Sequence, residues 1–177
     1  MKNFIEENNL AVHVLTSELE GKHYAMVATW ICPASLRTDE LRFTLPLSKY
    51  NDSAKAIIGS KNFILHKLTK KSFETAFKMG SSHSSEVDKF HGEEFQIHAS
   101  GARVLKSALA SGYAKVITHM ETEDRYILYC SLSEIKSNID NESPLTQGDL
   151  FAQLREEDRK TLGAKYLSDC NRDTPKA

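Results

Sequence analysis

Cysteine is scarce in this sequence, which has only Cys32, Cys130 and Cys170 among 177 residues. Their odd number and wide spacing argue against a disulfide framework and against the paired-cysteine sites that bind metals. No apolar run approaches the roughly eighteen residues that a membrane-spanning helix needs. The first twenty residues carry several acidic groups and no apolar run of the kind found in a secretory signal. The sequence therefore predicts a cytoplasmic protein with no metal site and no membrane contact.

An excess of charge of either sign is also missing. The 23 basic residues almost cancel the 24 acidic ones, whereas a protein that binds nucleic acid gathers a strongly basic surface against the phosphates. We therefore expect no nucleic-acid partner. A length of 177 residues with 40% hydrophobic residues fits one globular domain with a single core.

The sequence motifs of common catalytic sites are absent as well. The chain contains no G-x-G-x-x-G, no G-x-x-x-x-G-K-[ST] and no H-E-x-x-H. The run Gly80–Ser84 lacks the second glycine of a hydrolase nucleophile elbow. We assign no catalytic residue, because such a chain either binds a partner or takes its reactivity from a cofactor.

What the sequence does have is a series of short β-prone runs, at residues 11–19, 23–30, 41–47, 62–68, 94–98, 112–120 and 125–136. Two short helices are expected at residues 53–59 and 72–79, the first of them capped by Asn51 and Asp52. Apolar residues at helical spacing predict a longer helix over 147–168. The pattern indicates a mainly β protein of about six antiparallel strands, with a few short helices and a C-terminal helix.

The run Ile127–Cys130 places four apolar residues in one strand. Because neighbouring side chains of a strand point to opposite faces, both faces of this strand must be covered. A barrel wall meets this requirement when its inner face fills the barrel and its outer face packs on another element. We expect that element to be a second subunit, with residues 1–146 forming the barrel domain and residues 147–177 packing on it or across the dimer.

Four segments resemble the flavin reductase-like family. They are MVATWICPASL at residues 26–36, LSKYNDSAKAI at 47–57, MGSSHSSEVDKF at 79–90 and, more weakly, residues 108–135. The resemblance implies a split β-barrel of Greek-key type that acts as a homodimer. It also implies FMN, or alternatively FAD, bound with its ring between the subunits, and NAD(P)H as a possible co-substrate of the flavin.

The resemblance also assigns cofactor-binding residues to three of these segments. The first segment would face the isoalloxazine ring, the second would bind the phosphate at a helix start where backbone amides are free, and the third would contribute a polar loop. The residues so assigned are Ala28, Thr29, Trp30, Ser35, Ser48, Lys49, Asn51, Ser53, Ser82, Ser84 and Lys89.

The chain departs from the family pattern at several of these positions. Ser84 and Ser85 stand where the family commonly has Gly-Arg, and Asn51 stands where it often has a basic residue. Lys49 and Lys89 are therefore the remaining candidates to compensate the phosphate charge. Arg125 replaces a histidine that the family often places near the nicotinamide.

Alternatives remain open at the level of the sequence. Trp30 would serve equally well as a core or interface anchor, and Ser48 and Ser53 as turn and cap residues. The predicted function is an FMN-binding flavoprotein that acts as an NAD(P)H-dependent flavin reductase. The alternatives are an electron-transfer flavoprotein that uses NAD(P)H inefficiently and a cofactor-free interaction module on the same barrel.

Overall fold

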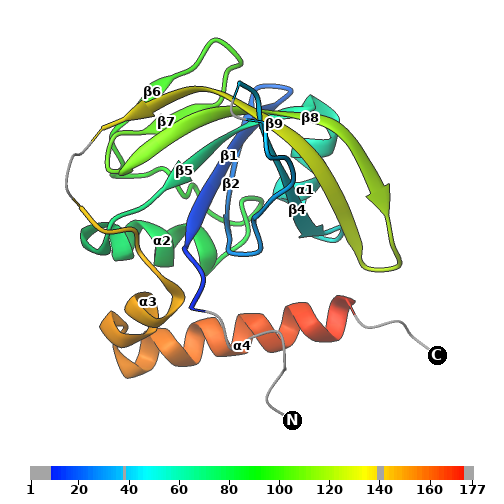
Figure 1. The fold of residues 1–177 in the computed structure, drawn as a ribbon. Coiled ribbons are helices and arrows are strands. Elements are labelled where there is room, and N and C mark those ends of the chain that lie inside the picture. Colours follow the sequence, from blue (N-terminus) through cyan, green and yellow to red (C-terminus); the bar gives the residue numbers. More distant parts are fainter. Residues whose placement is uncertain (1–8, 38, 139–141, 174–177) are drawn as a thin grey trace.

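A computed structural model describes residues 9–37, 39–138 and 142–173 (Figure 1). The strands are β1 (His13–Leu19), β2 (Lys22–Ala28), β3 (Cys32–Pro33), β4 (Leu41–Ser48), β5 (Asn62–Lys67), β6 (Phe95–Ile97), β7 (Arg103–Leu105), β8 (Ala110–Glu121) and β9 (Arg125–Ser137). The helices are α1 (Asp52–Ser60), the 3-10 turn η1 (Lys70–Ser72), α2 (Phe73–Gly80), α3 (Gln147–Gln153) and α4 (Glu156–Asp173). The fold is mainly β, as predicted.

Seven strands form one antiparallel sheet in the order β2-β1-β5-β8-β9-β4-β3. Its two edge strands, β2 and β3, follow one another in the chain and are joined by only Thr29, Trp30 and Ile31. Three extended residues and their flanking bonds span about 14 Å at most, whereas a flat sheet of this width would separate its edges by roughly 28 Å, at 4.7 Å per strand. The sheet is therefore rolled into a barrel whose split lies between β2 and β3.

The interior of this barrel holds the first of two buried apolar clusters. It contains Leu15 of β1, Leu45 of β4, Phe63 of β5 and Leu128 of β9, all with 1% or less of their surface exposed. In β9, Leu128 and Cys130 are buried, whereas Ile127 and Tyr129, which alternate with them, are only partly buried. The inner face of this strand thus fills the barrel as predicted, and its outer face is incompletely covered within one chain.

The connections between the first elements follow from local sequence. Leu19 pairs with Lys22 across a two-residue turn, and Glu20 and Gly21 both have positive φ values, 53° and 78°, as in the type I′ turns that match the twist of a hairpin. Helix α1 begins as predicted, with the Asn51 side chain accepting a hydrogen bond from the Ser53 backbone N–H at 2.9 Å.

The single C-terminal helix predicted over 147–168 is wrong, because the chain forms two helices there. Helix α3 ends at Leu154, whose ψ of 137° is extended. Leu150 and Leu154 are buried with α2 in the second apolar cluster, and this anchoring turns the chain before α4 begins at Glu156. Helix α4 then runs as a long rod beside the barrel (Figure 1). No helix within the described ranges is long and apolar enough to span a membrane.

The predicted count of about six strands agrees with the six long strands, but it omits β3 and β7. Both are short, with two and three residues, so neither shows the alternation of apolar and polar residues that identifies a strand. Strand β7 pairs with β6 in a separate two-stranded sheet.

Candidate functional site

A cavity of about 250 Å³ lies where β2 ends, between the start of α1 and the C-terminal half of α4. Gly80 at the end of α2 and Ser82 in the loop after it line one side of the cavity, and Arg125 at the start of β9 lines another. This cavity gathers most of the residues that the sequence assigned to the cofactor. Those lining it are Ala28, Thr29, Trp30, Ser48, Asn51, Ser82 and Lys89.

Four assigned residues lie outside this lining. Ser35 is in the loop after β3 and accepts a hydrogen bond from the backbone N–H of Arg37. Lys49 donates to Glu121 at 2.7 Å, and this contact raises the pKa of the lysine. Ser53 is buried, and Ser84 lines a different cavity. Seven of the eleven assigned residues thus line one cavity, and the other four do not.

The backbone of Ala25 explains where Ser53, Ser84 and Lys89 go. Its carbonyl oxygen accepts hydrogen bonds from the Ser53 hydroxyl at 3.0 Å, the Ser84 hydroxyl at 3.2 Å and the Lys89 ammonium at 2.8 Å. Strand β2 is an edge strand, so this carbonyl would otherwise lack a partner in the sheet. These three side chains cover the outer edge of β2 and lie between two cavities, both of which Lys89 lines.

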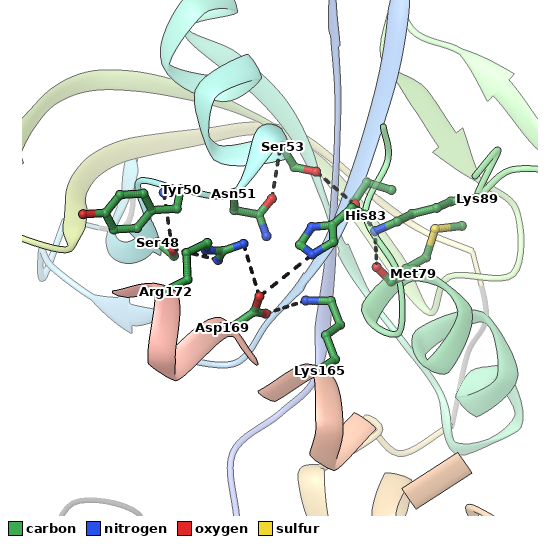
Figure 2. Close-up of polar contacts among 11 residues, drawn as sticks. Ser48, Tyr50, Asn51, Ser53, Met79, His83, Lys89, Lys165, Asp169 and Arg172 are labelled. Atoms are coloured by element: carbon green, nitrogen blue, oxygen red, sulfur yellow. Dashed lines mark hydrogen bonds and ion pairs between the residues drawn. The ribbon is translucent and has the colours of Figure 1, made fainter. Parts of the chain in front are cut away.

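Lys89 is the most constrained charged group near the site. Only 5% of its surface is exposed, and its ammonium also donates to the backbone carbonyl of Met79 at 2.7 Å (Figure 2). Burial lowers the pKa of Lys89 to about 8. The Lys89 ammonium donates its protons mainly to backbone carbonyls, although the side chain lines both cavities.

The second cavity, of about 710 Å³, lies on the other side of Ser53, Ser84 and Lys89. Its walls come from the β1–β2 hairpin, the first turns of α1 and the loop 84–89, with Arg103 at one end. The Arg103 guanidinium lies over the rings of both Phe90 and Phe95, at 4.5 Å and 4.3 Å from their centroids. The two cavities share Lys89, so they are neighbours.

Helix α4 brings charged residues to the first cavity that sequence reasoning missed. Figure 2 shows the Asp169 carboxylate between Lys165, Arg172 and His83. Lys165 Nζ lies 2.5 Å from one carboxylate oxygen, and Arg172 Nη1 lies 3.2 Å from the other. In the sequence these residues have only the i, i+4 and i, i+3 spacing of ordinary surface pairs, so no local signal marks them.

Arg125 also faces the first cavity, opposite Ser48 in the pairing of β4 with β9. Its Nε lies 3.2 Å from the Asp124 carboxylate, which fixes the guanidinium at the cavity wall. A guanidinium stays charged at neutral pH. It can therefore bind or orient an anionic group here, but it cannot release a proton.

The lining of the first cavity suits a phosphorylated flavin. The hydroxyls of Ser48 and Ser82, the Asn51 amide and the cations of Arg125 and α4 are donors for phosphate oxygens, whereas Met26, Leu47 and Trp30 offer apolar contact for a ring. About 250 Å³ is just below the usual range for small-molecule sites. The cavity of one chain therefore fits part of a flavin and leaves the rest beyond it.

Comparison with known proteins agrees with this chemistry. The flavin reductase-like domain model matches residues 7–154. The chain belongs to the flavin reductase-like family. It is 26% identical over 125 residues, or 70% of its length, to a Nostoc sp. protein that carries the name diflavin flavoprotein A 2, and it spans about a fifth (21%) of that protein.

Solved structures show the same fold. An FMN-binding protein from Thermus thermophilus superposes with a TM-score of 0.71 at 15% identity, over 82% of this chain and 83% of that one. An NADH:FAD oxidoreductase of Streptomyces globisporus gives a TM-score of 0.69 at 17% identity, over 77% and 80% of the two chains. These structures show the fold, and the family model shows the family.

Proposed function

We propose that the protein binds FMN in the first cavity and reduces it with NAD(P)H. The observation that carries the proposal is the convergence of Thr29, Trp30, Ser48, Asn51 and Ser82, taken from three separate family-like segments, on one cavity. A bound flavin supplies the hydride chemistry, since it accepts a hydride from a nicotinamide and passes electrons on.

The chain's own residues would hold and orient the cofactor. Asn51 caps the start of α1, where the helix presents backbone N–H groups and the positive end of its dipole to an anion, and Ser48 ends β4 three residues before it. Thr29 and Trp30 follow directly on β2, so their backbone and side chains would border the ring. Arg125 would stabilise negative charge on a reduced ring through a fixed positive charge.

We further propose that the protein is a homodimer with the flavin ring between the subunits. Trp30 and Leu41 are 49% and 43% exposed, and Leu36 is fully exposed; Leu41 pairs with Leu132 of β9, whose outer face is incompletely covered. Exposed apolar side chains that adjoin a cavity are typical of an interface. A twofold partner on this face would cover them and enclose the part of the flavin that one chain leaves open.

FAD is the second candidate cofactor, and the 710 Å³ cavity favours it. This cavity adjoins the first at Lys89 and carries the cations Lys22, Lys55 and Arg103 on its walls. An adenylate half that passed beyond the flavin phosphate would have room there. The electron-transfer alternative is supported by Arg125, because an arginine cannot supply a proton to the flavin.

A flavin titration tests the proposal. We expect the purified protein to bind FMN with the visible spectrum of a protein-bound flavin, and anaerobic NADH or NADPH to bleach it. Ser48→Ala should weaken FMN binding, whereas Ser168→Ala, an exposed serine that lines neither cavity, is the matched control. A protein that binds neither FMN nor FAD at micromolar concentration would refute the flavoprotein. Tight flavin binding without bleaching would refute the reductase and leave the electron-transfer protein.

A further inference from the structure

The phosphate of FMN carries negative charge that the site must compensate, and the two lysines expected to do so are engaged elsewhere. Lys49 pairs with Glu121, and Lys89 donates to the backbone carbonyls of Ala25 and Met79. Besides Arg125 of β9, the remaining cations that line the first cavity are Lys165 and Arg172, both on α4. The charge that the family-like motifs lack thus arrives from a different element.

The Asp169 carboxylate itself lies where an anion would be bound, among basic side chains. The Asp169 carboxylate forms ion pairs with Lys165 Nζ at 2.5 Å and with Arg172 Nη1 at 3.2 Å, and His83 Nε2 lies 3.9 Å from it. Arg172 also donates to the Ser48 hydroxyl at 3.4 Å, which ties this cluster to the segment before α1 (Figure 2). Carboxylate and phosphate oxygens accept from the same ammonium and guanidinium donors.

Ordinary pairing on a helix surface does not account for this cluster. The side chains of Lys165, Asp169 and Arg172 are 17%, 25% and 31% exposed, whereas Lys160 and Glu156 on the same helix are 75% and 83% exposed. A lysine that precedes its acidic partner by four residues is also the weaker orientation for a helix pair. The cluster is instead directed into the cavity, and it lies beyond residue 154, where the family match ends.

We propose that α4 completes the phosphate site of the flavin within the same chain. Lys165 and Arg172 bind the phosphate together with Ser48, and the Asp169 carboxylate competes with the phosphate for these two cations. The inference rests on the proposed flavin function and names the residues that supply its phosphate charge. It predicts that Asp169 weakens the binding of phosphorylated flavins and leaves the binding of riboflavin unchanged.

The test compares FMN with riboflavin, which lacks the phosphate, in four variants. Lys165→Met and Arg172→Met should each weaken FMN binding by roughly tenfold or more, the cost of one charge-assisted hydrogen bond, and should leave riboflavin binding unchanged. Asp169→Asn should tighten FMN binding and leave riboflavin unchanged. Lys160→Met removes an exposed lysine of the same helix and is the matched control. All three effects should shrink as salt is raised, since they are electrostatic.

Several outcomes would refute the role of α4 in phosphate binding and leave the proposed flavin function intact. Equal affinity of the unmodified protein for FMN and riboflavin would do so, as would Lys165→Met and Arg172→Met variants that bind FMN normally. Weaker FMN binding by Asp169→Asn would show that this carboxylate positions the cations and does not compete with the phosphate.

Inorganic phosphate separates this inference from the proposed function. If the unmodified protein bound neither flavin, the proposed function would fail. A rise in melting temperature with phosphate that is lost in Lys165→Met but kept in Lys160→Met would then support the anion site by itself. Absence of that rise would refute it.

Discussion

His66 lies completely buried in β5 and joins three strands through its ring. Its Nδ1 is 3.1 Å from the Val14 carbonyl of β1, and its Nε2 accepts the Leu105 N–H of β7 at 3.0 Å. Nε2 therefore carries no proton, and Nδ1–H donates to Val14. Burial lowers the pKa of His66 to about 4, so the folded protein holds this ring neutral.

The sign of the pH effect follows from this difference between folded and unfolded chains. Above pH 6.5 the ring is neutral in both states, and His66 adds no pH dependence. As the pH falls from 6.5 towards 4, the unfolded chain binds a proton that the folded chain does not, so the free energy of unfolding decreases. A change of pKa from 6.5 to about 4 corresponds to a loss of about 2 kcal/mol by pH 5 and about 3 kcal/mol by pH 4.

Urea denaturation followed by far-UV circular dichroism at pH 7.5 and pH 5 measures this effect. His13 has a lowered pKa of about 4 as well, so the difference between the unmodified protein and His66→Asn isolates His66. The variant should be less stable at pH 7.5, because the Leu105 N–H loses its acceptor. It should nevertheless lose about 2 kcal/mol less than the unmodified protein between the two pH values. An unchanged pH dependence in the variant would refute the assignment of a buried neutral ring.

Three further predictions concern the core, the assembly and the chemistry. Leu145→Ala should lower the free energy of unfolding by about 2–5 kcal/mol, because Leu145 is fully buried, whereas the exposed Leu167→Ala should change it little; urea titration compares the two. Sedimentation should give about twice the chain mass of 19.9 kDa, and a monomer at all micromolar concentrations would contradict the interface at Trp30. Arg125→His should speed anaerobic reduction of bound FMN by NADH or NADPH in stopped-flow absorbance, and an unchanged rate would show that this position does not limit hydride transfer.

The long strands and the first helix could be predicted because their signals are local. Asn51 caps α1 as its side-chain chemistry requires, and Ile127–Cys130 alternates between barrel and outer face as strand geometry requires. The break at Leu154 could not be predicted in the same way. Apolar spacing continues through it, and the helix ends there because Leu154 is buried against another part of the fold, which is a tertiary effect.

The residues of the candidate site also differ in whether a local sequence signal or only tertiary packing brings them to the cavity. The assigned residues that share the first cavity, at positions 28–30, 48, 51, 82 and 89, each belong to a contiguous segment with a recognisable order. Lys49 was misleading because its sequence neighbours face the cavity while its own side chain reaches Glu121 across the barrel rim. Lys165, Asp169 and Arg172 are distant in sequence from all of these segments, and only the packing of α4 beside the barrel brings them to Ser48.

The boundary drawn at residue 146 therefore separates two parts of one site. The family match ends at residue 154, and α4 begins at Glu156, so the matched barrel offers hydroxyls, an amide, a helix start and Arg125, while Lys165 and Arg172, which face the same cavity, come from outside it. A helix start alone carries only about half a unit of positive charge, too little to balance a phosphate. The resemblance to the family implies basic residues where this chain has Ser84, Ser85 and Asn51, so a second source of charge is needed, and α4 is placed to supply it. Because the same helix carries Asp169 between those cations, it sets both the strength and the selectivity of anion binding at this cavity.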